Sequence, residues 1–181
     1  MRRIPIFRNS RAAAADENVQ QVCIWTPDKD LAQCVQGERV VQVLRKARTI
    51  LDAAGVRTKF GVGPERIADF LALVGDAADG YPGIEGIGRR GAARLINQYG
   101  ALEDFPPAVL GQHRELALLF KDLATLRSDA RLFATLEELR WRGPSETFPA
   151  VAAQIGDHGL LARSLSAAQN GIRRTGHTSA G

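Results

Sequence analysis

The first sixty residues alternate short apolar runs with turn-forming residues, a pattern typical of strands joined by tight connections. Residues 22–26 form a run of β-branched and aromatic side chains that predicts a buried strand. Residues 39–44 alternate in polarity and predict a second strand, and residues 49–52 predict a weaker third. Between the first two, residues 31–35 predict a short helix.

From Pro64 onward the apolar side chains follow a helical period of about 3.6 residues. They predict one helix over residues 64–74 and a second over residues 89–99. A longer amphipathic helix is predicted over residues 113–128, and one more over residues 146–165. Because strands come first and helices dominate later, the pattern indicates an α/β segment followed by a mostly helical one.

The two ends of the chain carry weaker patterns. The first eleven residues are basic and aperiodic, so we expect a loose arm, followed by a short helix at the alanines of residues 12–15. A strand and a helix are expected within residues 131–168, and the polar, glycine-rich last residues are expected to be disordered. The predicted domain boundaries are therefore 1–21, 22–58, 59–130, 131–168 and 169–181.

Composition narrows the class of protein. With 181 residues and 45% apolar side chains, the chain can bury a core, and its net charge of +4 favours an anionic partner. Cys23 and Cys34 lie in apolar runs and are expected to be two buried free thiols in a reducing compartment. The scattered histidines exclude a structural zinc site, and no apolar run is long enough for a transmembrane helix. We therefore expect a soluble cytoplasmic protein.

Two pairs of aspartates are candidate metal ligands. Asp28 and Asp30 follow the first predicted strand, and in an extended segment both side chains would project to one side. Alternatively, Asp28 caps the following helix and Asp30 complements its dipole. Asp76 and Asp79 lie three residues apart and would share a face in a helical turn, or else belong to a solvated turn. Together these oxygen ligands suit Mg²⁺ or Mn²⁺, ions that assist phosphodiester hydrolysis.

A glycine-rich stretch lies directly after the second pair. Residues 86–91 match G-x-G-x-x-G, but residues 81–85 contain proline and glycine and cannot form the buried strand that a dinucleotide site requires. The stretch instead predicts a helix-hairpin-helix, whose glycines let backbone N–H groups face a DNA phosphate. Its alternative is an ordinary helical corner with solvated arginines. The predicted DNA-binding residues are Lys59, Gly83, Gly86, Gly88, Arg89, Arg90 and Arg94.

Four segments of the chain carry a family resemblance: residues 25–33 (WTPDKDLAQ), 59–62 (KFGV), 69–79 (DFLALVGDAAD) and 82–88 (PGIEGIG). On these residues the chain resembles the bacterial 5′–3′ exonuclease family, which includes the 5′-nuclease domain of DNA polymerase I and is related to flap endonucleases. The resemblance implies an α/β remnant of a PIN-like nuclease core, followed by a mostly α-helical helix-hairpin-helix subdomain.

The resemblance also implies a metal-dependent nuclease. The aspartates would hold divalent metal, and the hairpin would bind duplex or flapped DNA near the nucleoid, with K⁺ as a further candidate ion there. Gly80 departs from the family, which has asparagine at that position. Family members also carry acidic ligands upstream, whereas this chain has no carboxylate before Asp16.

We therefore expect the carboxyl-terminal part of a 5′–3′ exonuclease that binds duplex DNA weakly. It should cleave little unless another chain supplies the missing half. The alternatives are a non-catalytic helix-hairpin-helix DNA-binding module and a remnant without independent function.

Overall fold

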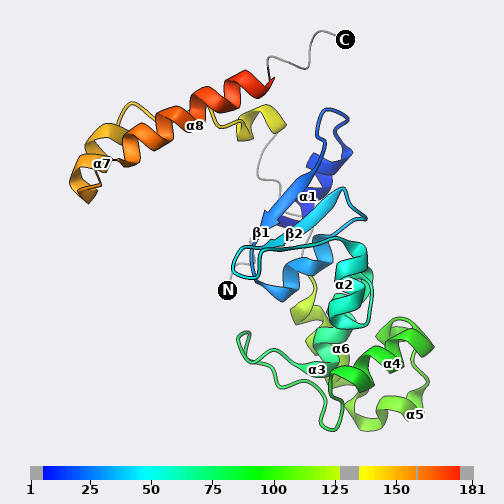
Figure 1. The fold of residues 1–181 in the computed structure, drawn as a ribbon. Coiled ribbons are helices and arrows are strands. Elements are labelled where there is room, and N and C mark those ends of the chain that lie inside the picture. The colour runs from blue at the N-terminus through cyan, green and yellow to red at the C-terminus, as the bar shows by residue number, and fades with distance from the viewer. Residues whose placement is uncertain (1–5, 127–134, 158, 176–181) are drawn as a thin grey trace. The chain divides into compact units, whose positions relative to one another are not determined.

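The computed structural model describes residues 6–126, 135–157 and 159–175 (Figure 1). The chain divides into two compact units, Met1–Leu132 and Phe133–Gly181, which are described separately. Within the described residues, none of the helices combines the length and the apolar character that a membrane crossing requires.

The first unit contains the three predicted strands. β1 (Val22–Trp25) pairs in parallel with β2 (Val40–Leu44), and β2 pairs antiparallel with β3 (Thr49–Leu51). The sheet order is β1-β2-β3, so β2 is central and β1 lies at an edge (Figure 1). The strand and helix types predicted for residues 22–52 are therefore confirmed, with the helix between β1 and β2 present as the 3-10 helix η1 (Lys29–Cys34).

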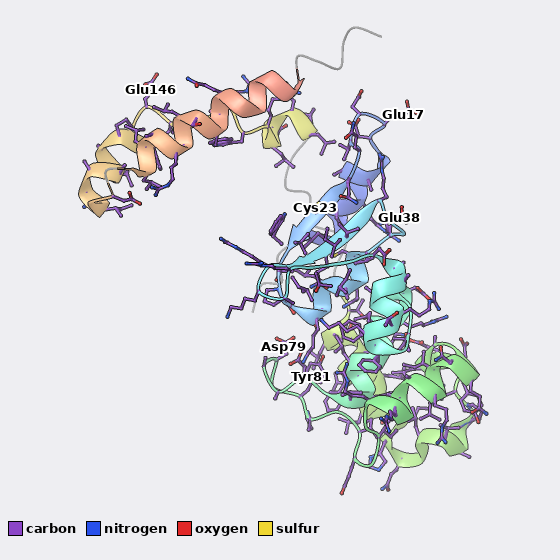
Figure 2. The ribbon with its side chains drawn as sticks, in the orientation of Figure 1. Glu17, Cys23, Glu38, Asp79, Tyr81 and Glu146 are labelled. Carbon is purple, nitrogen blue, oxygen red and sulfur yellow. The ribbon has the colours of Figure 1, made fainter. Side chains whose placement is uncertain are left out.

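The prediction that β1 is buried is wrong, because only Ile24 of its residues is buried. Successive side chains of a strand face opposite sides, and the side that carries Cys23 and Trp25 is exposed (Figure 2). The expectation of two buried thiols fails for the same reason: Cys34 is buried in η1, whereas Cys23 is exposed.

The loose arm is also wrong in part, because helix α1 spans Ile6–Ala15. The alanines that end α1 favour a helix, and the Ala14 carbonyl in its last turn has a charged partner from the turn that precedes β2. The Arg39 guanidinium donates to the backbone oxygen of Ala14, with Nη2 at 3.1 Å, and to that of Asp16 at 2.7 Å. A cation at this end also complements the helix dipole.

The helical part of the first unit surrounds one buried helix. α3 (Ile67–Val74) is buried over nearly its whole length and packs against α4 (Arg89–Tyr99) and α6 (Arg114–Ala124). These helices confirm the three predicted from apolar spacing. The remaining elements of this part are α2 (Ala53–Phe60), η2 (Pro64–Arg66), η3 (Leu102–Asp104), α5 (Pro107–Leu110) and η4 (Gly111–His113). A single core includes Val35 and Leu51 as well as Phe70 and Ala117, so the sheet-containing and helical ranges share it.

One carboxylate is buried inside this core. Asp69 of α3 is 1% exposed, and its Oδ1 lies 2.7 Å from the Lys121 ammonium of α6. The same oxygen accepts a hydrogen bond of 2.9 Å from the Leu102 backbone N–H, and Arg66 lies 3.8 Å from Oδ2. Lys121 also pairs with Glu103. This network joins α3, η3 and α6.

The described residues of the second unit form three helices joined by turns. It contains η5 (Leu136–Leu139), α7 (Phe148–Ile155) and α8 (Leu160–Thr175). The single helix expected over residues 146–165 is thus two helices, because Gly156 adopts a left-handed φ of +77° and ends α7. The described residues of 131–168 contain no strand. α8 continues to Thr175, so that part of the expected disordered tail is helical, and residues 176–181 lie outside the described residues.

The two cysteines give a test of this fold. We expect the native chain to show one fast and one slow thiol toward iodoacetamide at pH 8, because burial raises the pKa of Cys34 to about 11 while a Ser10 hydrogen bond offsets only part of this rise. Brief alkylation followed by peptide mass spectrometry should label Cys23 first. Equal labelling of both cysteines in the folded chain would contradict the burial of η1, and urea should remove the difference.

Candidate metal centre and nucleic-acid interface

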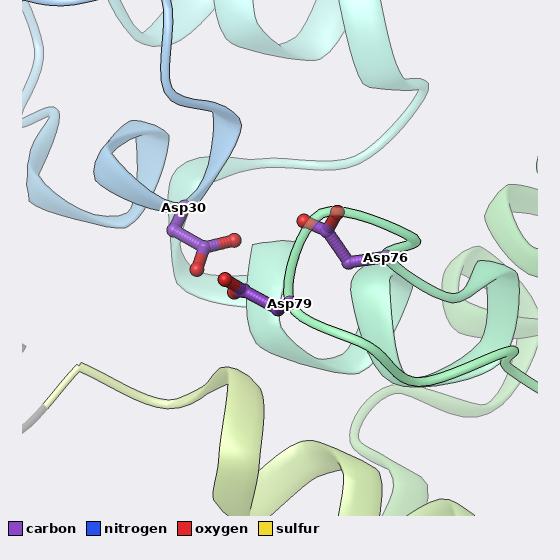
Figure 3. Close-up of side chains that lie close together, drawn as sticks. All are labelled: Asp30, Asp76 and Asp79. Carbon is purple, nitrogen blue, oxygen red and sulfur yellow. The ribbon is translucent and has the colours of Figure 1, made fainter. Parts of the chain in front are cut away.

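Three of the four predicted ligands come together at one corner of the first unit. One carboxylate oxygen from each of Asp30, Asp76 and Asp79 lies within 4.8 Å of the others (Figure 3). Asp30 belongs to η1, and the other two lie in the loop that follows α3. Asp30 and Asp76 are buried, whereas Asp79 is exposed. The cluster therefore joins two segments that are far apart in sequence.

The loop over residues 76–81 holds Asp76 and Asp79 by its own hydrogen bonds. The backbone groups of Asp76 and Tyr81 bond each other in both directions, at 2.8 and 3.1 Å, and so close the loop. The Asp76 Oδ1 also accepts a bond of 3.0 Å from the Ala78 N–H. Gly80, where the family resemblance expects asparagine, has a φ of +83°, a conformation that glycine and asparagine both tolerate.

Asp28 does not join the cluster. Its carboxylate accepts a hydrogen bond of 3.1 Å from the Asp30 N–H and caps η1. The alternative reading of Asp28 as a helix cap thus matches the geometry. The chain turns into a 3-10 helix at Lys29, so Asp28 and Asp30 do not share one side of an extended segment.

Gln42 is a positioning residue that the sequence reasoning missed. It is fully buried on β2, and its Nε2 donates to the backbone oxygens of Thr26 at 3.1 Å and Asp28 at 2.6 Å. These bonds fix the connection from β1 to η1, and so they fix the position of Asp30. A polar residue at the centre of an apolar strand was the signal that could have revealed it.

Lys29 was missed as well. Its ammonium lies 2.9 Å from the Asp76 Oδ1, and Asp76 is only 4% exposed. The ammonium therefore places a positive charge beside the buried carboxylate. The signal in the sequence was a lysine placed between two aspartates of the predicted metal site.

The donor set fits a hard divalent cation. Three carboxylates offer oxygen ligands only, which suit Mg²⁺ or Mn²⁺ and not a soft metal. Oxygens as much as 4.8 Å apart leave room for an ion that keeps several waters, as Mg²⁺ does in proteins.

The hairpin glycines have two different roles. Gly83 has a φ of +79° and packs directly on the end of α3, where a Cβ would lie 2.4 Å from the Gly75 backbone nitrogen. A Cβ at Gly86 or Gly88 would meet nothing within 4 Å. Gly83 is thus required for packing, whereas Gly86 and Gly88 leave the backbone before α4 open to a ligand.

The predicted basic residues also divide into two groups. Arg90 and Arg94 are exposed and lie four residues apart on one face of α4, and among the described residues no salt bridge involves either of them. Gly88 precedes α4 as its N-cap and offers no side-chain cap, so the first N–H groups of the helix remain available beside these arginines. This arrangement favours a phosphate.

Arg89 and Lys59 gather around one aromatic ring. The Arg89 guanidinium carbon lies 5.7 Å from the Phe60 ring centre, and Lys59 Nζ lies 5.1 Å from the same centre. Arg89 also lies 5.2 Å from the Phe70 ring centre and bonds the Lys59 backbone oxygen at 3.4 Å. Burial and the neighbouring Arg89 charge lower the pKa of Lys59, and an anionic ligand would relieve the repulsion between the two cations.

Comparison with known proteins shows which family the chain resembles. The family model "5′-3′ exonuclease, C-terminal SAM fold" matches residues 62–147. DNA polymerase I of Bacillus caldotenax is 32% identical over 170 residues, which cover 86% of this chain and 19% of the polymerase. The 5′-3′ exonuclease of Aquifex aeolicus is 36% identical over 135 residues, which cover 68% of this chain and 45% of the exonuclease.

A solved structure shares the fold. The bacteriophage T5 flap endonuclease, in a complex with DNA and metal ions, aligns with a TM-score of 0.54 at 19% identity, covering 65% of this chain and 49% of the endonuclease. The likeness confirms a small α/β core followed by a helical subdomain. The chain spans less than half of the length of each of these proteins. Over residues 62–147 the chain is similar to the C-terminal SAM-fold domain of the 5′-3′ exonuclease family.

Proposed function

We propose that this chain contributes a metal site and a DNA-binding hairpin to a structure-specific 5′ nuclease, which hydrolyses phosphodiester bonds in DNA with Mg²⁺ or Mn²⁺. The observation that carries the proposal is the joining of three carboxylates and an open glycine hairpin in one compact unit. The hairpin, Asp76 and Asp79 lie within residues 62–147, which match the 5′-3′ exonuclease family model.

Within the metal site, each carboxylate would have a distinct part. Asp30 and Asp76 are buried and held by their loops, so they would fix the ion, whereas the exposed Asp79 can adjust to it. Asp28 would support the site by capping η1. A divalent ion bound there would stabilise the charge that develops on the phosphate oxygens during hydrolysis.

The hairpin would bind the sugar–phosphate backbone of duplex DNA. The N–H groups at the start of α4 and the Arg90 and Arg94 side chains offer phosphate contacts, and Lys59 with Arg89 would extend them. Such contacts do not read bases, so binding should be tolerant of sequence and sensitive to salt. K⁺ stays a candidate ion for the hairpin, and replacing K⁺ by tetramethylammonium in binding buffer tests it.

The chain alone is expected to cleave poorly. Two closely spaced divalent ions need several bridging carboxylates, and three cannot hold both in working geometry. A second chain that carries the rest of the nuclease core would complete the site, and the edge strand β1 offers backbone groups to pair with it.

The second candidate function is a non-catalytic DNA-binding module, which the complete hairpin favours.

A cleavage assay separates the two functions. With a 5′-flap substrate and Mn²⁺, the chain should show weak cleavage if it is part of a nuclease, and Asp76→Asn should abolish that cleavage and weaken Mn²⁺ binding at least about tenfold. Mn²⁺ affinity can be measured by electron paramagnetic resonance of the free ion. The matched control is Glu38→Gln, which removes an exposed carboxylate outside the cluster and should change neither quantity.

Salt-dependent duplex binding with neither cleavage nor Mn²⁺ binding at the cluster would support the module instead. Mn²⁺ binding that is unchanged in Asp76→Asn would contradict the proposed metal site.

A further inference from the structure

A cavity of about 720 Å³ lies between residues 25–27, residues 43–47 and Lys59. We call it the Trp25 groove. It is formed where the parallel strands β1 and β2 end side by side, with Trp25 opposite Val43 in the register. The turn from β2 to β3 and the last turn of α2 form its other walls. The acidic cluster does not line this cavity.

The groove presents an aromatic surface to solvent. Trp25 is 67% exposed, although an indole is among the most costly side chains to leave in water. An exposed indole can take a nucleobase face to face, and such stacking is the usual source of affinity for single strands. In a duplex the bases are already stacked and cannot present this face.

The charge of the groove selects the class of ligand. Arg45, Lys46 and Lys59 line it, and no carboxylate does. Among the described residues, no salt bridge involves any of these three cations. A ligand that satisfies both features must be anionic along its length and must carry flat apolar rings. Single-stranded nucleic acid has both properties.

Lys59 links the groove to the start of α4. Lys59 lines the groove, and its ammonium shares the Phe60 ring with Arg89, the first residue of α4. A strand whose phosphates bind at the start of α4 could therefore continue past the cations of Arg89, Lys59 and Lys46 into the groove. At its other end, residues 26 and 27 lead directly to the acidic cluster.

We propose that the Trp25 groove binds single-stranded DNA, with one base stacked on Trp25 and its phosphates held by Arg45, Lys46 and Lys59. The inference rests on the proposed function, in which the hairpin holds the adjoining duplex. It adds a separate site for the unpaired strand at a branched or frayed end, and so it predicts that a junction binds more tightly than a blunt duplex of the same length.

Tryptophan fluorescence tests the groove directly. In a Trp141→Phe background, Trp25 is the only tryptophan, and Trp141 lies exposed in the other unit. Titration with a dT oligonucleotide of about ten nucleotides should quench Trp25 emission to saturation. By oligonucleotide anisotropy, Trp25→Ala should raise Kd about 5- to 150-fold, and Trp25→Phe should retain part of the affinity.

The charge contribution is measured by salt dependence. Lys46→Gln should lower the slope of log Kd against log salt by about 0.7, because one single-strand phosphate contact is lost. The matched control is Arg57→Gln, an exposed cation of α2 that does not line the groove, and it should leave the slope unchanged. An unchanged slope in Lys46→Gln would overturn the assignment of the phosphate path.

A blunt duplex keeps this test independent of the proposed function. Trp25→Ala should bind the blunt duplex as the parent chain does. Unchanged dT binding in Trp25→Ala, or dT binding without quenching, would overturn the groove while the hairpin proposal stands. Failure of the parent chain to bind duplex, with Trp25 still quenched by dT, would contradict the hairpin alone. A Trp25 emission shift that follows protein concentration without DNA would assign the groove to a protein contact and overturn the inference.

Discussion

Replacing Gly83 with alanine is expected to destabilise the first unit by more than about 4 kcal/mol and to abolish duplex binding. The residue has a φ of +79°, which costs a residue with a Cβ about 1–2 kcal/mol. The larger cost is steric. The new Cβ would lie 2.4 Å from the Gly75 nitrogen, 2.5 Å from the Val74 carbonyl carbon and 2.7 Å from the Leu73 oxygen. These are backbone atoms, so the hairpin must separate from α3.

The matched control for this substitution is Gly86→Ala. Gly86 has nearly the same φ, +78°, but a Cβ there meets nothing within 4 Å. Only the conformational cost of about 1–2 kcal/mol should appear. Urea denaturation gives the stabilities, and anisotropy with a labelled blunt duplex gives the affinities. Equal losses of stability in the two variants would show that packing against α3 does not hold the hairpin.

Lys121→Met is expected to lower the free energy of unfolding by about 3 kcal/mol. The substitution removes the ammonium that lies 2.7 Å from a carboxylate with 1% exposure, and an uncompensated buried charge costs about 3–5 kcal/mol. The low end applies because the Asp69 carboxylate keeps the Leu102 N–H and the Arg66 guanidinium at 3.8 Å. Thermal and urea unfolding measure the change.

Two further variants isolate the buried pair. In the double variant Asp69→Asn with Lys121→Met, much of the stability should return, because no buried charge is left alone. Glu103→Gln removes the exposed partner of Lys121 and should cost less than about 1 kcal/mol. A double variant no more stable than Lys121→Met alone would show that the loss comes from packing and not from the charge.

The difference in stability between the parent chain and Lys121→Met should depend on pH, because the pKa values of Lys121 and Glu103 are shifted in the folded parent chain. Burial would lower the pKa of Lys121, but hydrogen bonds to Asp69 and Glu103 outweigh it and raise the pKa above 10.5. The stabilisation that charged Lys121 contributes is therefore complete below pH 10.5, and it is lost as pH rises through the pKa of Lys121 in the folded chain. Burial would raise the pKa of Glu103, but Lys121 lowers it below 4.5. The stabilisation that charged Glu103 contributes is therefore lost as pH falls below 4.5. The advantage of the parent chain over Lys121→Met should thus be largest between these limits.

The helices next to the hairpin could be predicted closely because local chemistry ends them. Gly88 and Gly100 bound α4, and Pro64 begins the segment that leads into α3. Other elements depend on distant contacts that apolar spacing does not reveal. The last carbonyl groups of α1 are bonded by Arg39, which lies 25 residues from Ala14, and a basic stretch of sequence gives no sign of this. The break between α7 and α8 did have a local signal in Gly156.

In the candidate site, too, local sequence identifies individual residues, whereas their arrangement depends on distant contacts. Asp76 and Asp79 could be identified from their spacing, and Asp30 from its place after a strand. Their meeting depends on how η1 packs against α3, which spacing alone does not give. The metal role predicted for Asp28 assumed an extended backbone through residue 30. In the structure η1 begins at Lys29, directly after Asp28. Whether Asp28 nevertheless affects metal affinity stays a prediction.

The contact between Lys29 and Asp76 has a consequence for how the acidic corner is assembled. Three carboxylates so close together would repel one another in a metal-free chain, and the loop over residues 76–81 would have to close against that repulsion. The Lys29 ammonium, which lies 2.9 Å from the Asp76 Oδ1, supplies a tethered counter-ion that offsets part of this negative charge. The corner can then fold before any metal arrives. A divalent ion would then displace the Lys29 ammonium from Asp76. The measured affinity of the ion would be the difference between its own binding free energy and that of the ammonium at the same carboxylates.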